Sequence, residues 1–195
     1  MFGADRASAG TVEVDGKPVG RGPRAGIKAG MGFITEDRKL EGLALAQPIR
    51  DNTLLALRSL GGKQRRRLPG TVSVQELARS VELRARSLEQ EARFLSGGNQ
   101  QKVVLAKWLT MNPRVLICDE PTRGVDVGAK SEIYRMLRDL ADAGVSILMI
   151  SSDMEEVIGV SDRIAVMHEG AISGFLERPE FSEQKILRLA VGDTS

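Results

Sequence analysis

Two adjacent carboxylates, Asp119 and Glu120, follow the apolar run 115–118 and precede Pro121. Adjacent carboxylates repel each other and need a counter-charge. At the end of a buried strand they are suited to a metal ion and a water beside a phosphate, because phosphoryl transfer depends on positioning and charge neutralisation. We expect Asp119 to hold Mg2+ and Glu120 to polarise the attacking water. The alternative is an acidic strand end that caps the following turn.

A second candidate is the segment LSGGNQ at residues 95–100, which runs into a helix. Two glycines at a helix start let backbone amides approach an anion closely, and the helix dipole adds partial positive charge there. Ser96 can donate its hydroxyl to a phosphate oxygen. The alternative is a plain serine N-cap with a flexible entry.

Apolar strands alternate with helices around these residues. We predict strands at 31–37, 115–118 and 145–150, and helices at 50–60 (capped near Asp51 or Asn52), 95–113, 127–143, 153–159 and 182–190. The polar segment 72–91 has apolar residues at helical spacing, and hairpins are predicted at 10–19 and 163–176. This alternation indicates an α/β fold with a parallel sheet. Ligands gather at the carboxyl ends of such strands, so segments 35–37, 119–120 and 151–153 are expected to form one composite site.

The segments LSGGNQQKVVLAKWL and VLICDEPTRGVDVGAK resemble the signature motif, Walker B strand and D-loop of ABC-type ATPases. Their exact form, together with GFITEDRKLEGL and ISSDMEEVIGVSDRIAVMHEG, is similar to the second nucleotide-binding domain of tandem sugar-importer subunits, the ribose, galactose and xylose group. The resemblance covers essentially the whole chain. It implies a P-loop-NTPase-like sheet with flanking helices, a small antiparallel β part, and a helical signature subdomain at about 40–110, all in one domain over residues 1–195.

The resemblance also implies roles for single residues. Ser96, Gly97, Gly98 and Asn99 stand at signature positions that face a nucleotide, and Asn99 replaces the usual glutamine. Asp126 lies in the D-loop 124–126. Asp119 stands at the metal-site position and Glu120 at that of the catalytic glutamate.

Two positions depart from the broad ABC pattern. Glu36 stands where the Q-loop glutamine is usual, and Ser152 where the switch histidine is usual. The implied roles are nucleotide binding for Glu36 and catalysis for Ser152. Both departures resemble the sugar-importer subfamily, yet they weaken the case for full catalytic power, since serine cannot carry the charge of histidine. The single histidine, His168, is interpreted as structural.

A phosphate-binding loop of the form G-x-x-x-x-G-K-[ST] is missing from the sequence. GVDVGAKS at 124–131 has the wrong spacing, and GGK at 61–63 has no first glycine at the right distance. In the family this loop precedes a segment resembling MFGADR, with which this chain starts. We therefore expect a truncated domain that lacks the Walker A strand and loop, and exposed apolar edges on its sheet.

Composition bounds the remaining possibilities. The 195 residues are 42% hydrophobic and 28% charged with a net charge of +2, which favours a soluble protein and gives no reason to expect nucleic acid. One cysteine, Cys118, excludes an intrachain disulfide. No apolar run approaches membrane-spanning length. The segment 61–70 carries four basic residues and is expected to be an exposed loop; a nucleic-acid patch is the alternative.

Three functions remain open at this stage. The first is an ATP-binding fragment of a sugar importer, peripheral on the cytoplasmic side of the membrane, with ATP and Mg2+ as ligands. Its expected partners are transmembrane permease subunits docked on residues 40–95, an N-terminal nucleotide-binding domain or second ATPase subunit and, indirectly, a periplasmic sugar-binding protein. The second is a non-catalytic module that supplies signature and docking surfaces. The third, a DNA-repair ABC head, is disfavoured by the RGVDVGAK segment, by the absence of a coiled-coil insertion and by the near-neutral charge.

Overall fold

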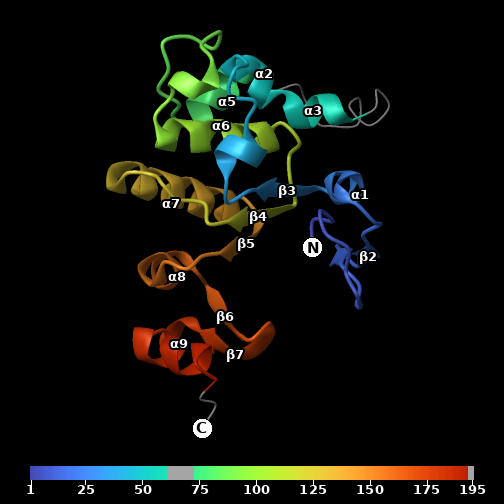
Figure 1. Ribbon diagram of the computed structural model, residues 1–195, viewed down its shortest axis with the longest axis vertical. Coiled ribbons are helices and arrows are strands. Elements are labelled where there is room, and N and C mark those ends of the chain that lie inside the picture. The colour runs from blue at the N-terminus through green and yellow to red at the C-terminus, as the bar shows by residue number, and fades with distance from the viewer. Residues whose placement is uncertain (61–72, 193–195) are drawn as a thin grey trace. The chain divides into compact units, whose positions relative to one another are not determined.

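The computed structural model describes residues 1–60 and 73–192 (Figure 1). The chain divides into two compact units, Met1–Ile150 and Ser151–Ser195, and each is described by itself. Among the described residues, no helix combines the length and the hydropathy that crossing a bilayer requires.

A parallel sheet forms the centre of the first unit. Its strands are β3 (Met31–Ile34), β4 (Val115–Asp119) and β5 (Ser146–Ile150), in the order β3-β4-β5. Cys118 pairs with both Ile34 and Met149, so the three carboxyl ends meet at one edge. The predicted parallel sheet is confirmed, with β3 three residues shorter than expected.

Helices pack around α6 (Gly97–Leu109), as Figure 1 shows. Among its described residues, this unit also contains α1 (Pro23–Lys28), the π-helical turn η1 (Arg38–Gly42), α2 (Ile49–Thr53), α3 (Leu55–Ser59), α5 (Val74–Ser80), the 3-10 turn η2 (Ala92–Phe94) and α7 (Val127–Asp142). The predictions of α6 and α7 are confirmed to within a few residues at each end.

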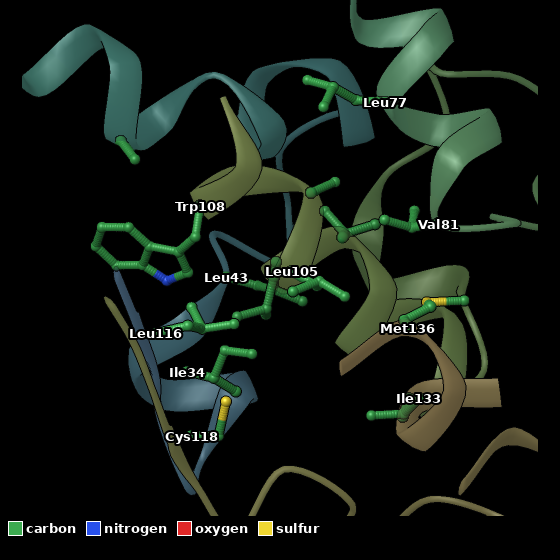
Figure 2. Packing of buried hydrophobic residues seen from close by; sticks show 14 of the residues in the cluster. Ile34, Leu43, Leu77, Val81, Leu105, Trp108, Leu116, Cys118, Ile133 and Met136 are labelled. Carbon is green, nitrogen blue, oxygen red and sulfur yellow. The ribbon is translucent and has the colours of Figure 1, made fainter. Parts of the chain in front are cut away.

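The main core lies between the sheet and α6 (Figure 2). Side chains alternate along β4, so Leu116 and Cys118 face the helices and are fully buried. Residues three and four apart on α7, including Ile133, Met136 and Leu137, are buried as well. This core fixes α6 and α7 against β4, and thereby their amino ends near its carboxyl end.

The predicted amino-terminal hairpin is confirmed. Strands β1 (Glu13–Val14) and β2 (Lys17–Pro18) pair across the turn Asp15-Gly16, with both turn residues at positive φ. Val14 packs with Met31 and Ile117, which alternation puts on the sheet face opposite α6. Asp15 forms an ion pair with Arg114.

Two helix predictions were wrong in extent. The helix expected over 50–60 is two short helices that meet at Leu54, and its N-cap is Pro48. Asn52 is buried and bonds the backbone at Ala44, Gln47 and Pro48, so tertiary contacts override the capping preference. Of the described residues 73–91, only Val74–Ser80 form a helix, with the left-handed Glu82 just beyond. The basic segment 61–70, predicted to be an exposed loop, lies outside the described residues.

One face of β5 carries exposed apolar side chains. Leu148 is 39% exposed and Ile150 is 45% exposed, while Ile147 and Met149 pack against the main core. Within the described residues β5 pairs only with β4. Exposed apolar surface was expected on this sheet.

The second unit contains α8 (Met154–Val160), β6 (Arg163–His168), β7 (Ala171–Glu177), the turn η3 (Arg178–Glu180) and α9 (Glu183–Ala190). The predicted hairpin turns at Glu169-Gly170, and Ile164, Val166 and Leu176 pack against Ile186 of α9. The ring of His168 bonds the carbonyl of Ala190 with its Nδ1 at 2.8 Å, which supports a structural role.

Candidate functional site

The carboxyl edge of the sheet gathers two of the three predicted segments. Asp119 is the last residue of β4, Glu120 follows it, and Glu36 lies two residues beyond the end of the adjacent β3. The backbone N–H of Glu120 donates to the carbonyl of Ile150 on β5 at 2.9 Å. Ser152 belongs to the second unit, so its place in the composite site stays a prediction.

Glu120 has a left-handed backbone, with φ of 45°. Such a conformation costs a residue with a side chain about 1–3 kcal/mol and persists where the surroundings impose it, often at functional sites. Here the bond to Ile150 fixes the peptide that precedes the side chain. In the part of the chain that the structure describes, four other non-glycine residues, among them Asp15 and Glu82, share this backbone, so it fixes the direction of the carboxylate and leaves its role a prediction.

The electrostatics around Asp119 favour a cation. Burial raises the pKa of the Asp119 carboxyl, and the charge of Glu120 raises it further. A cation beside the pair would relieve both effects. The described residues contain no cluster of three or more metal-ligating side chains. Mg2+ is usually held by one or two carboxylates together with substrate phosphates and waters, so Asp119 and Glu120 fit it when a phosphate is present.

Glu36 is paired within the chain. Its carboxylate forms an ion pair with the Arg123 side chain, which extends from the loop after β4. The pair ties the loop after β3 to the loop after β4, and the guanidinium offsets the negative charge of Glu36 itself.

Ser96 caps α6 and bonds Asn99 twice. The Asn99 backbone N–H donates to Ser96 Oγ at 3.4 Å and its side-chain Nδ2 donates at 2.8 Å. A hydroxyl oxygen has two acceptor positions and one proton, so both acceptor positions are filled. The hydroxyl proton therefore points elsewhere and can be donated to an anion at the start of the helix.

The orientation of the Asn99 amide is set by a third residue. The backbone N–H of Arg84 donates to Asn99 Oδ1 at 2.8 Å. A flipped amide would place its NH2 group against the N–H of Arg84, so two donors would face each other. The amide oxygen would then face Ser96 and accept its hydroxyl proton. Asn99 thus orients Ser96 rather than reaching outward itself, a role that the sequence did not reveal.

The two signature glycines allow close packing. A Cβ built at Gly98 would stand 2.4 Å from the Cβ of Ala129 on α7. One built at Gly97 would stand 2.7 Å from both Arg38 Nη2 and the carbonyl oxygen of Gly124. Neither glycine has positive φ, so the requirement is space. Close packing is thus a second reason for glycine at these two positions, in addition to the anion access predicted from the sequence.

Signature and D-loop residues meet around one cavity of about 180 Å³. Ser96, Gly98 and Asn99 line it from α6, and Asp126 and Gly128 line it from the start of α7. Asp126 Oδ1 accepts the Ala129 N–H at 3.0 Å and caps α7. Two helix amino ends, each with partial positive charge, thus face the same space.

Sequence reasoning missed three charged residues that also line this cavity, Arg84, Lys102 and Glu132. Lys102 on α6 is 2% exposed in its side chain, and its Nζ donates to Glu132 Oε2 at 2.6 Å and to the Glu82 carbonyl at 2.9 Å. Arg84 bonds the other oxygen of Glu132 at 2.8 Å. The Lys102 bond, more than any other contact, lowers the pKa of Glu132. A lysine inside an apolar run was the only sequence signal.

In the second unit, Ser152 lies between two well-bonded neighbours. Ser151 Oγ bonds the Glu156 carboxylate, and the Asp153 N–H donates to Ser151 Oγ at 3.0 Å. Asp153 in turn caps α8 by accepting the Glu156 N–H at 3.2 Å. This loop is therefore ordered by its own hydrogen bonds.

Comparisons with known proteins agree on one family. The family model described as ABC transporter matches residues 1–123. The chain is 50% identical over 197 aligned residues to the ribose import ATP-binding protein RbsA of Lactococcus lactis subsp. cremoris (strain SK11), covering 98% of this chain and 40% of that protein. It is 46% identical over 198 residues to the protein of the same name from Yersinia pestis bv. Antiqua (strain Antiqua), covering 100% of this chain and 39% of that one. The chain thus spans about 40% of the length of these curated relatives.

Solved structures support the fold. A nucleotide-free ATP-binding cassette from an ABC transporter matches with a TM-score of 0.77 at 18% identity, covering 98% of this chain and 80% of that one. The dimeric post-hydrolysis state of the ATP-binding cassette MJ0796, bound to ADP and Pi, matches with a TM-score of 0.73 at 21% identity, and the match covers 92% of this chain and 78% of that one. The predicted fold class is therefore confirmed.

Proposed function

The chain belongs to the ABC transporter family, and from that premise we propose that it is the ATP-binding part of a monosaccharide importer. Ribose is the favoured substrate because of the names of its relatives, with galactose and xylose as alternatives. The observation that carries the proposal is the meeting of Ser96, Gly98, Asn99 and Asp126 around one cavity. We further propose that residues 1–195 form part of the second nucleotide-binding domain of a tandem subunit.

At the carboxyl edge of the sheet, residues of this chain would bind Mg2+ and activate the water that attacks the phosphate. Mg2+ bound with ATP neutralises charge on the phosphates. Asp119 would hold that ion, since its raised pKa shows a carboxylate whose charge is poorly compensated. Glu120, fixed by the Ile150 carbonyl, would orient and polarise the attacking water. Glu36 contributes to the nucleotide site through its pair with Arg123, and Ser152 is proposed to act in the same step.

At the amino end of α6, the chain acts on a nucleotide held by a partner domain. Ser96 donates its hydroxyl proton to a phosphate oxygen, and the backbone amides of Gly97 and Gly98 add donors at the positive end of the helix. Asn99 keeps the Ser96 proton directed outward. This half-site needs no phosphate loop in the same chain.

The alternative is a non-catalytic module that supplies signature and docking surfaces to its partner. It is favoured by one observation, that the 195 residues contain no G-x-x-x-x-G-K-[ST] sequence. We therefore propose hydrolysis for the assembled importer and none for the isolated chain.

We propose that the permease docks on the helical part at about residues 40–95, on the cytoplasmic side of the membrane. Leu40 is 83% exposed and Phe94 is 66% exposed, and large exposed apolar side chains are typical of docking surfaces. The partner that associates with this chain in the presence of ATP would be an N-terminal nucleotide-binding domain or a second ATPase subunit. The sugar-binding protein would act through the permease, and nucleic acid has no part in the proposal.

The test compares two serine N-caps in the complete importer. Ser96→Ala is expected to lower ATP hydrolysis at least about tenfold, because it removes a proton donor to the phosphate. Ser73 caps α5 with its own bond to Glu76, so Ser73→Ala controls for loss of a cap. If both variants hydrolyse ATP and import sugar like the wild type, the proposed function of the signature segment is wrong.

A further inference from the structure

We propose that Arg38 is a positioning residue that holds the loop after β4 against the first turn of α6 and so sets the spacing between Ser96 and Glu120. The proposal rests on the proposed function, because it concerns the two half-sites assigned there. The Arg38 guanidinium bonds the backbone of the loop after β4 and Gln100 on α6. It acts through the backbone that carries Ser96 and Glu120.

The Arg38 side chain lies buried between two segments that are distant from it in sequence, the loop after β4 and α6. It is 8% exposed, and its Nη1 donates to the Arg123 carbonyl at 2.7 Å while Nη2 donates to the Gly124 carbonyl at 3.0 Å. Nε donates to Gln100 Oε1 on α6 at 3.4 Å. One planar guanidinium thus bonds the loop after β4 on one side and α6 on the other.

The connection runs in both directions. Arg38 bonds the backbone of Arg123, and the side chain of Arg123 returns to pair with Glu36, two residues before Arg38. Gln100 continues the network by donating through Nε2 to the Ala92 carbonyl at 3.3 Å. The segments after β3 and after β4 therefore cannot shift apart without breaking several charge-assisted bonds.

Gly97 is explained by this arrangement. A Cβ there would stand 2.7 Å from Arg38 Nη2 and 2.7 Å from the Gly124 oxygen, so the guanidinium and the carbonyl it binds both lie over the glycine. The first signature glycine is the residue that lets Arg38 reach the loop after β4.

Burial of the Arg38 guanidinium has a cost, which its bonds to two carbonyls and to Gln100 offset. Burial lowers the pKa of the Arg38 guanidinium, and the charge of Asp37 opposes that shift. The segments that Arg38 joins carry Ser96 and Asp126, which line the signature cavity, and Glu120, which is proposed to serve the chain's own nucleotide. A misplacement of about 1 Å between such groups can cost about a hundredfold in rate.

The test uses Arg38→Lys, which keeps the charge but cannot bond two carbonyls and Gln100 in one fixed plane. The control is Arg58→Lys, because Arg58 is exposed and pairs with Asp51 at 2.8 Å. Backbone amide exchange is measured in the purified chain. For Arg38→Lys we expect about tenfold faster amide exchange in both segments, 97–100 and 123–127, and an unchanged exchange rate in β4. The control variant should exchange like the wild type in all three places. Faster exchange in one segment alone, or in neither, overturns the proposal.

In the complete importer, Arg38→Lys is expected to lower the turnover number for ATP about 10- to 100-fold and to change KM less than about twofold. A change in KM alone would contradict positioning. Should Arg38→Lys fail to fold, Gly97→Ala is the second variant, since its Cβ must displace the guanidinium or the carbonyl, and the same paired exchange is expected. A wild-type importer without ATPase activity would refute the proposed function, while the exchange data would still decide the role of Arg38.

Discussion

Substitution of Gly98 by alanine sets two known effects of opposite sign against each other. Gly98 lies in the first turn of α6 without positive φ, so alanine is allowed by the backbone and favours the helix by about 0.5–1 kcal/mol. However, its Cβ would stand 2.4 Å from the Cβ of Ala129 on α7. Carbon atoms pack best at about 3.5–4.0 Å, so the helices would have to separate by more than about 1 Å.

The clash is expected to win. Overpacking of a well-packed site costs about 1–3 kcal/mol, and neither Cβ belongs to a flexible side chain that could move away. Gly98→Ala should therefore lower the free energy of unfolding by about 0.5–2 kcal/mol. In an Ala129→Gly background the nearest remaining atoms are Val125 Cγ1 at 3.6 Å and Ala129 Cα at 3.9 Å, which are ordinary contacts. There the same substitution should become stabilising by about 0.5–1 kcal/mol.

The assay is urea unfolding followed by the fluorescence of Trp108, the single tryptophan, which is buried in the first unit. Gly128→Ala is the matched control, because its nearest atom is Asp126 Oδ1 at an ordinary 3.5 Å. A double-mutant cycle of Gly98 and Ala129 gives their coupling energy. If Gly98→Ala stabilises the chain with Ala129 present, α6 and α7 do not approach as described, and the second signature glycine serves the anion alone.

Three further predictions concern charge and proton placement. Asn99→Asp should weaken ATP-dependent association with the partner domain about tenfold by titration, because a carboxylate captures the Ser96 proton, whereas Asn99→Gln keeps an amide and should lose less. Burial lowers the pKa of Lys107 from 10.5 to about 8. Between these pH values the unfolded chain binds more protons than the folded chain, so the free energy of unfolding of the wild type rises with pH by up to about 3 kcal/mol. Lys107→Met should abolish that rise in urea titrations, and an unchanged slope would contradict the prediction. Burial, and then the charge of Glu120, raise the pKa of Asp119, so the ionised carboxylate destabilises the metal-free chain at pH values above the pKa of the unfolded state. Asp119→Asn should therefore raise the melting temperature at pH 7 without Mg2+. A lower melting temperature would refute this reasoning.

The strands and helices around the site could be predicted because their patterns are long and consistent. The apolar run of β4 ends where the acidic pair begins, and α7 repeats apolar residues every three or four positions to its end near Gly144. Short helices were less predictable. Asn52 suggested a cap but is buried with four backbone partners, a tertiary arrangement that no local pattern reveals.

The motif residues could be predicted, whereas the residues that hold them could not. Arg38 and Lys102 are charged and would be placed at the surface by any average preference, yet both are buried because backbone carbonyls and Glu132 converge on them from distant segments. The sequence singled out Gly97 and Gly98 for anion access, but the close approach of Arg38 and Ala129 to them depends on packing between helices and loops.

The central claim is that this chain supplies a signature half-site to a nucleotide held by another domain. Calorimetry should titrate Mg-ATP into the chain alone, into a partner ATP-binding domain with an intact phosphate loop, and into the equimolar mixture. We expect no binding of Mg-ATP to the chain alone and tighter binding by the mixture than by the partner domain, and Ser96→Ala should abolish that gain in affinity. Micromolar binding of Mg-ATP to the chain alone, unchanged by Ser96→Ala, would contradict it.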